Sequence, residues 1–173
     1  MTALPFAAFL FIAPVSAPAQ TPAPPPPPVI EYSDEYQLRA KIHKVGSFAM
    51  LPLAGAEYLL GQSVYNGNTN NKGAHIAVGT AISGLFAINT VTGVWNLYEG
   101  RNDPNGRTKR WIHAILMMTA DAGFVATAAS APGGERRSGT STTLTDQRNT
   151  HRTLALGSLA VGTVGYLIML IGK

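Results

Sequence analysis

The sequence predicts an all-α integral membrane protein, folded as an antiparallel bundle of four transmembrane helices. Three observations lead to this fold class. The chain of 173 residues is 46% apolar and only 13% charged, which is unusual for a soluble domain. Its apolar residues gather in four runs of about 18 to 24 residues, each long enough to cross about 30 Å of hydrocarbon. Polar segments rich in Gly and Asn separate these runs, as loops do.

The N-terminal part of the chain is predicted to stand apart from the bundle. Residues 1–19 contain a short apolar run and an Ala-Pro-Ala sequence that ends at Ala19, which together indicate a secretory signal peptide. Residues 20–37 are rich in proline and are predicted to form a disordered linker in the polyproline II conformation. The bundle domain then comprises residues 38–173.

Within this domain, the predicted spans are residues 45–65, 74–97, 111–131 and 154–171. Short loops between them make neighbouring helices antiparallel. Gly and Ala recur within the spans, and such small residues let helices approach closely or leave room for a flat ligand. Both interpretations predict a compact bundle.

Two signals disagree about the orientation of the bundle. Lys and Arg are more numerous on the side of the N-terminal linker, eight against five, and the positive-inside rule would place that side in the cytoplasm. A linker exported behind a signal peptide requires the opposite orientation. We give the signal peptide more weight. We therefore expect a multi-pass protein of a bacterial inner membrane, in contact with lipid, with its linker on the exported side.

The composition excludes several kinds of site. No cysteine is present, so disulfides, thiolate-bound metals, iron–sulfur clusters and covalently attached c-type haem are ruled out. The net charge of +4 is carried by short stretches between the apolar runs, which is where the flanks of membrane spans carry it. No nucleic-acid partner is therefore expected, and histidine, carboxylate and methionine are left as metal ligands.

The four histidines are distributed one to each predicted helix, near the end where the chain enters the span. His43 and His113 enter from the linker side, whereas His75 and His151 enter from the opposite side. Alternate helices of an antiparallel four-helix bundle are diagonal neighbours. His43 is therefore expected to face His113 across the core, and His75 to face His151. The result is two pairs, one near each membrane face.

Two imidazoles that face each other across a bundle core suit the two axial positions of a haem iron. Histidine is a good axial donor, and filling both positions favours electron transfer over oxygen binding. We predict two b-type haems, one bound by His43 and His113 and one by His75 and His151. Zinc or copper is disfavoured because each face offers two imidazoles and no thiolate. Taken singly, each histidine has the alternative of an interfacial residue whose polar tip reaches water.

Glu57 and Asp121 lie inside predicted spans, where an ionisable group is a functional candidate. A step of 14 residues is about 21 Å of helix and nearly a whole number of turns. From His43 that step reaches Glu57, and from His75 it reaches Asn89, so each is expected level with the haem at the opposite face. Glu57 and Asp121 are candidates to take up a proton coupled to reduction or to bind a quinone. The alternative is a hydrogen bond to a neighbouring helix or to a group beside the ligands.

Small residues are expected beside a porphyrin. Gly46 follows His43 by three positions, and Gly79 follows His75 by four, so each lies on the same helical face as its histidine. Both glycines are predicted to leave room for the ring.

This arrangement of histidines resembles the cytochrome b561 family over roughly residues 38–172. The resemblance is carried by His43, His75, His113 and His151 and by the segments His75-Ile-Ala-Val-Gly79 and His151-Arg152-Thr-Leu-Ala-Leu-Gly157. It implies a transmembrane oxidoreductase that passes electrons through two haems, with a quinol, a small reductant or another cytochrome as redox partner. We recognise no ascorbate-binding motif, so donor and acceptor stay open.

Two other functions also stay open. One is a cofactor-free membrane subunit that packs against partners through its Gly and Ala faces. The other is a haem-binding or quinone-binding subunit of a larger respiratory or photosynthetic complex. A reduced-minus-oxidised absorption spectrum separates the first of these from a cytochrome.

Overall fold

The computed structural model describes residues 30–132 and 141–171. The predicted signal peptide, residues 1–19, and residues 20–29 of the predicted linker lie outside this part of the chain. The described residues form four long helices and two single turns of 3-10 helix, and no strand occurs among them. The elements are α1 (Asp34–Tyr65), η1 (Thr69–Asn71), α2 (Lys72–Glu99), η2 (Gly100–Asn102), α3 (Arg107–Ala129) and α4 (Ser141–Ile171).

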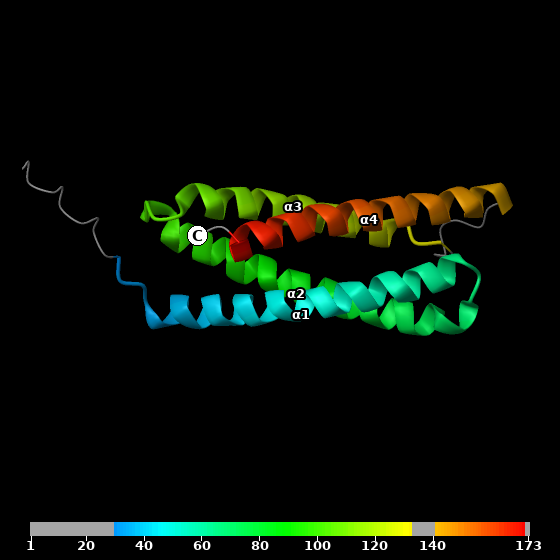
Figure 1. Cartoon of the computed structure of the whole chain (residues 1–173), viewed down its shortest axis with the longest axis horizontal. Helices are drawn as coiled ribbons and strands as arrows, with labels where there is room; N and C mark the ends of the chain where they lie inside the picture. The colour runs from blue at the N-terminus through cyan, green and yellow to red at the C-terminus, as the bar shows by residue number, and fades with distance from the viewer. Residues whose placement is uncertain (1–29, 133–140, 172–173) are drawn as a thin grey trace, which may run out of the picture.

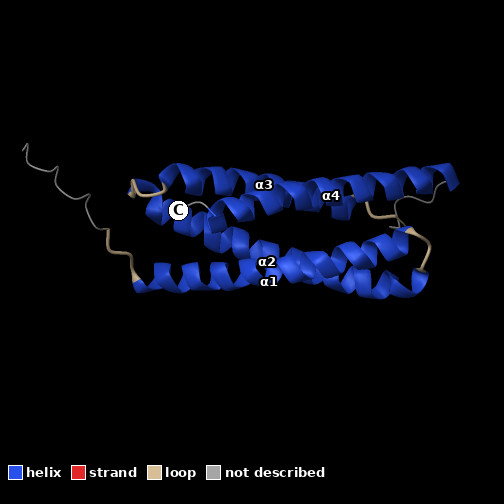
Figure 2. Ribbon diagram, in the orientation of Figure 1, coloured by secondary structure: helices blue, strands red, loops and turns tan. Residues whose placement is uncertain are grey.

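The four helices run along the long axis of the molecule and alternate in direction, so α1 begins and α4 ends at the same end (Figure 1). α1 packs mainly on α2, and α3 mainly on α4. The bundle therefore consists of two antiparallel hairpins that face each other (Figure 2), joined by the short α2–α3 connection that contains η2. The predicted antiparallel order of helices is confirmed.

Two of the helices begin more than two turns before their predicted spans. α1 begins at Asp34, where the Ser33 side chain accepts a hydrogen bond from the backbone N–H of Tyr36 and two acidic residues in the first turn suit the positive end of the helix dipole. The predicted linker, residues 20–37, therefore overlaps the first turn of α1. α4 begins at Ser141, well before its predicted span. Each extension is polar, since hydropathy locates the apolar part of a helix and not its ends.

The closely packed core is confined to the middle of the bundle. Ile82, Phe86 and Ala120 are buried there, and the rings of Phe86 and Phe124 have centroids 4.8 Å apart. Gly162 of α4 also lies against this cluster, since a Cβ on it would be at ordinary contact distance, 3.9 Å, from Cζ of Phe86. The hairpins thus touch firmly at mid-height.

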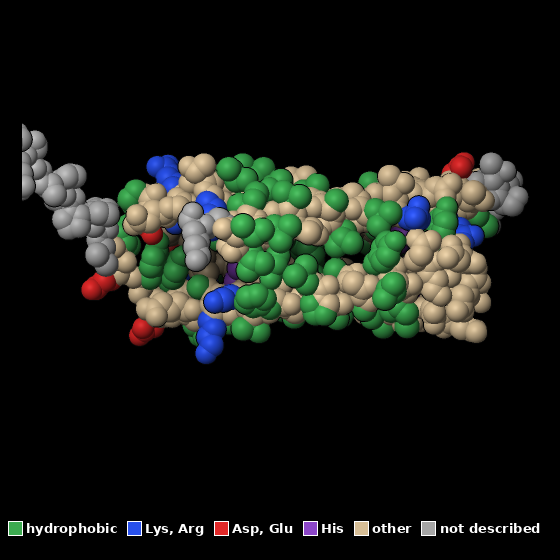
Figure 3. Space-filling model, in the orientation of Figure 1, with side chains coloured by type: hydrophobic (Ala, Val, Ile, Leu, Met, Phe, Trp, Pro, Cys, Tyr) green, Lys and Arg blue, Asp and Glu red, His purple; other side chains and the backbone are tan. Residues whose placement is uncertain are grey.

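Three of the four long helices, α2, α3 and α4, are long and apolar enough to cross a membrane. α1 does not reach the same hydropathy, since it carries Glu57 and Pro52 within its apolar stretch. The fourth predicted span, residues 45–65, therefore stays a prediction. On the face shown in Figure 3, hydrophobic side chains cover the middle of the molecule, and charged groups lie toward its two ends. This distribution suits a protein surrounded by lipid.

Candidate cofactor site: two histidine pairs

The structure brings the four histidines together in the two predicted pairs. His43 on α1 and His113 on α3 have ring centroids 6.1 Å apart and ring planes at 85°. His75 on α2 and His151 on α4 also have centroids 6.1 Å apart, with planes at 87°. Each pair joins one hairpin to the other. The diagonal pairing predicted from the order of the helices is confirmed.

The separation of the rings suits two ligands of one metal. Two imidazoles bound on opposite sides of a metal, each through a nitrogen at about 2.0 Å, have centroids about 6 Å apart, since each centroid lies about 1 Å behind its nitrogen. An edge-to-face pair of aromatic rings without any metal has centroids about 4.5 to 7 Å apart. The distance alone therefore fits both arrangements, and the hydrogen bonds of the rings distinguish them further.

In three histidines, Nδ1 is held by a backbone carbonyl of the other helix in the same hairpin. A carbonyl oxygen only accepts, so Nδ1 donates and Nε2 keeps its lone pair. Metal-binding histidines commonly hold their second ring nitrogen in this way. The distances are 2.9 Å from His43 Nδ1 to Asn89 O, 2.9 Å from His113 Nδ1 to Gly165 O, and 2.8 Å from His151 Nδ1 to Thr127 O.

His75 differs from the other three, because its Nδ1 lies 2.8 Å from Oε1 of Glu57 on α1. This is a close carboxylate–imidazole contact and not a hydrogen bond, since His75 Nδ1 is buried without a hydrogen-bond partner. The second oxygen of Glu57, Oε2, is buried without a hydrogen-bond partner. The side chains of His75 and Glu57 are each 23% exposed.

One register recurs on all four helices. The residue 14 positions after each histidine lies beside Nδ1 of the other histidine in its hairpin, and these residues are Glu57, Asn89, Thr127 and Gly165. The predicted levels of Glu57 and Asn89 are thus confirmed. Sequence analysis missed Thr127 and Gly165, although the same step from His113 and His151 reaches them. Each of them acts through its backbone carbonyl, which every residue type has, so the residue type does not reveal this role.

In the hairpin formed by α1 and α2, the first hairpin, two glycines lie directly beneath the histidine rings of the facing helix. A Cβ on Gly93 of α2 would lie 2.9 Å from Cε1 of His43. A Cβ on Gly61 of α1 would lie 3.3 Å from Cε1 of His75. Each ring therefore lies directly over a glycine of the facing helix, and a larger residue there would displace it.

The predicted use of Gly46 and Gly79 was wrong. A Cβ on Gly46 would collide with the side-chain amide of Asn89, and a Cβ on Gly79 would lie 2.9 Å from Oε1 of Glu57. The space beside these glycines is therefore filled by side chains of the facing helix. Their role is to let the two helices of the hairpin interlock, and not to leave room for a ring.

Both histidine pairs lie outside the closely packed middle of the bundle. All four histidines are half-buried, and histidine atoms are visible at two places on the face shown in Figure 3. Among the described residues, no group of three or more His, Cys, Asp or Glu side chains could hold a metal ion. A haem iron needs only two ligands from the protein, so the two pairs suit that group better than a bare ion.

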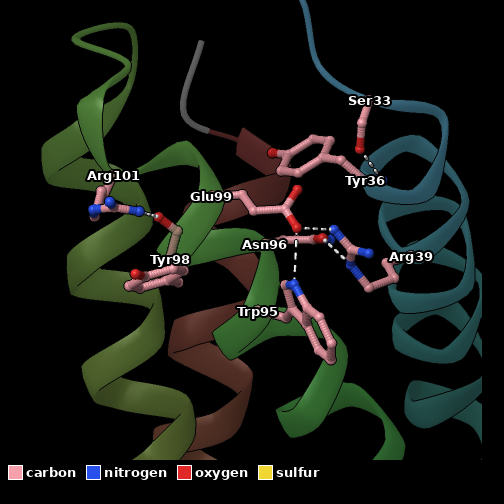
Figure 4. A network of polar contacts seen from close by, with 8 residues as sticks. All are labelled: Ser33, Tyr36, Arg39, Trp95, Asn96, Tyr98, Glu99 and Arg101. Atoms are coloured by element: carbon pink, nitrogen blue, oxygen red, sulfur yellow. Dashed lines mark hydrogen bonds and ion pairs between the residues drawn. The ribbon is translucent and has the colours of Figure 1, made fainter.

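The end of the bundle near His43 is closed by a polar network. Arg39, one turn before His43, donates to Oε1 of Glu99 at 2.5 Å and to Oδ1 of Asn96 at 3.2 Å. Trp95 donates to the same Glu99 oxygen at 2.8 Å, and the Arg39 guanidinium lies 5.0 Å from the centroid of its ring. Figure 4 shows this network joining α1 to α2.

A second contact at this end ties the start of α1 to the segment between α2 and α3. The hydroxyl of Tyr32 donates to Oδ2 of Asp103 at 2.6 Å, and its ring stacks on Tyr36 with centroids 4.0 Å apart. The hydrogen bond from Tyr32, followed by one from the backbone N–H of Asn105, lowers the pKa of Asp103. Burial and the hydrogen bond to Asp103 raise the pKa of Tyr32.

The opposite end has a different arrangement, centred on Tyr65. The guanidinium groups of Arg148 and Arg152 lie 5.4 Å and 4.8 Å from the centroid of its ring. The Tyr65 hydroxyl donates to Oδ1 of Asn149 at 2.9 Å. These contacts join the end of α1 to the polar extension of α4.

Asp121 lies apart from both pairs, and Thr90 of α2 donates a hydrogen bond to its Oδ2. This contact agrees with the simpler of the two interpretations, a hydrogen bond between neighbouring helices. The other oxygen, Oδ1, is buried without a hydrogen-bond partner. No contact links Asp121 to a histidine within the described chain.

Comparisons with known proteins find no relative of this chain. A scan against protein-family models, a search of curated proteins and a search of solved structures all find no match. The resemblance to the cytochrome b561 family therefore stays a prediction that depends on the histidines themselves.

Proposed function

We propose that this protein is a membrane cytochrome of the b type, similar to cytochrome b561, that transfers electrons across a membrane through two haems. The observation that carries the proposal is the pairing of all four histidines across the two hairpins, with ring centroids 6.1 Å apart in both pairs. His43 and His113 would hold one haem, and His75 and His151 the other. The donor and acceptor would be a quinol, a small reductant or another cytochrome.

The tasks of the protein in this reaction are ligation and orientation. Nδ1 of three histidines donates to fixed backbone carbonyls, which holds each ring in one orientation and would leave its Nε2 lone pair available to bind iron. Two such ligands leave no open position for oxygen. When bound, the haem iron supplies the one-electron redox step.

The placement of the pairs supports transfer between membrane faces. Each histidine is separated by 14 residues from the residue that holds Nδ1 of the other histidine in its hairpin, so the two levels lie about 21 Å apart along the helices. The packed contact of Phe86 with Phe124 occupies the middle of the bundle. One pair would therefore lie near each face of a membrane.

We also propose that α1 is the fourth transmembrane helix. It packs along α2 and exposes Val45, Phe48 and Leu59, whereas its carboxyl group at Glu57 is directed to His75 inside the bundle. The mean hydropathy of α1 includes this carboxyl group, although the group does not face lipid. Reporter insertions before α1, at Glu31, and after it, at Asn70, test this arrangement, and we expect them on opposite sides of a bacterial inner membrane, with Glu31 on the exported side.

An absorption spectrum of the purified protein tests the cytochrome function. We expect reduced b-type bands and two haems per chain when the protein is produced in haem-replete cells. A colourless, folded preparation from such cells would overturn the proposal. It would favour a cofactor-free subunit, in which each histidine pair is an ordinary edge-to-face contact.

A further inference from the structure

The two histidine pairs have the same ring separation but differ in one partner. His43, His113 and His151 each direct Nδ1 to a backbone carbonyl. His75 alone has a carboxylate, with Oε1 of Glu57 at 2.8 Å. At the corresponding level of the other pair, the residue 14 positions after His75 is Asn89, whose side chain is a neutral amide.

The position of Glu57 is built into the hairpin. Its side chain lies over Gly79, and the ring of His75 lies over Gly61. The other level repeats this interlocking, with Asn89 over Gly46 and His43 over Gly93. The surroundings of His75 and of His43 are therefore matched in shape, but the side chain beside His75 carries a carboxyl group and the one beside His43 a neutral amide.

We propose that Glu57 is a tuning residue that lowers the reduction potential of the haem held by His75 and His151 below that of the haem held by His43 and His113. This inference rests on the proposed dihaem function. It also sets a direction, because electrons run from the centre of lower potential to the centre of higher potential. The favoured flow is from the membrane face near His75 to the face near His43.

The physical reason is the charge beside the ligand. A carboxylate near Nδ1 raises the basicity of the imidazole and stabilises the oxidised, more positive iron over the reduced iron. This effect is strong where little water screens the charge. The other charges next to the ligands are on exposed side chains, Lys44 beside His43 and Arg152 beside His151, and Arg152 lies over the ring of Tyr65. Solvent and salt screen such groups more effectively.

A redox titration of the purified dihaem protein, followed by its absorption, tests the inference. The wild type should be reduced in two steps. The variant E57Q keeps the shape but removes the charge, so it should still bind two haems and should shift only the lower step upward. E57D keeps the charge and should retain a low first potential. H113A, which keeps the haem at His75, should show the lower step alone.

The matched variant is N89D, which places a carboxyl at the corresponding level of the other pair. We expect it to shift the upper step downward and bring the two steps together. Two bound haems with both potentials unmoved in E57Q would overturn the tuning role while leaving the cytochrome function intact. If E57Q fails to bind haem, an unmoved upper step in N89D overturns it instead. A wild type without haem would remove the proposed function itself.

Discussion

The two ends of this bundle present the same pair of imidazoles in different surroundings. Ring centroids are 6.1 Å apart in both pairs, because the helix register that positions them is the same. Near His43 the partner on Nδ1 is a neutral carbonyl, and a network around Arg39 closes the end. Near His75 the partner is the carboxylate of Glu57. Helix geometry thus determines the site, whereas individual side chains determine its electrostatics.

The largest expected effect is the loss of one bound haem when a single histidine is replaced. H113A should remove about half of the bound haem, since two centres are expected and His113 serves only one of them. H151A is the matched variant for the other end and should remove the other half. Haem content per chain, measured by absorption after extraction, checks both. If either variant lost all of its haem while the bundle remained folded, the two ends would not be independent.

A smaller effect is expected from glycines beneath the rings. G93A places a Cβ 2.9 Å from Cε1 of His43, whereas G61A places one 3.3 Å from Cε1 of His75. Overpacking of this kind costs about 1–3 kcal/mol, so we expect G93A to weaken haem binding at its end more than G61A does at the other. Haem dissociation rates measure the difference.

The control for this series is G55A, since a Cβ on Gly55 has nothing within 4 Å. It should leave haem binding unchanged and can stabilise the helix by about 0.5–1 kcal/mol, because Ala restricts the unfolded chain more than Gly does. Equal haem loss in G55A and G93A would contradict the packing of His43 on Gly93.

The smallest effect concerns acid stability at the His43 end. The hydrogen bond from Tyr32 holds the pKa of Asp103 below its usual range. A carboxyl whose pKa is lowered by folding contributes stability above its unfolded pKa, near 4, and that contribution is lost as the pH falls through the folded value. Y32F should therefore show less loss of thermal stability between pH 5 and pH 2 than the wild type. Unchanged acid sensitivity would contradict this assignment.

Much of the fold follows from local sequence signals. The four helices coincide with runs of apolar residues, and the α1–α2 and α2–α3 connections with segments rich in Gly and Asn. The starts of α1 and α4 could not be predicted in this way, because both lie in polar sequence. The helical residues around Tyr36 were assigned to a linker, since their contact with the α2–α3 segment is visible only in the folded chain.

The histidine pairs show what the sequence by itself determined. One histidine near the start of each of four antiparallel helices is sufficient to predict His43 opposite His113 and His75 opposite His151, since the order of helices and the helical repeat determine the position of each ring. Only the tertiary structure decided what holds the rings. Backbone carbonyls are the same in every residue, so the partners at Asn89, Thr127 and Gly165 depend on how two helices slide against each other.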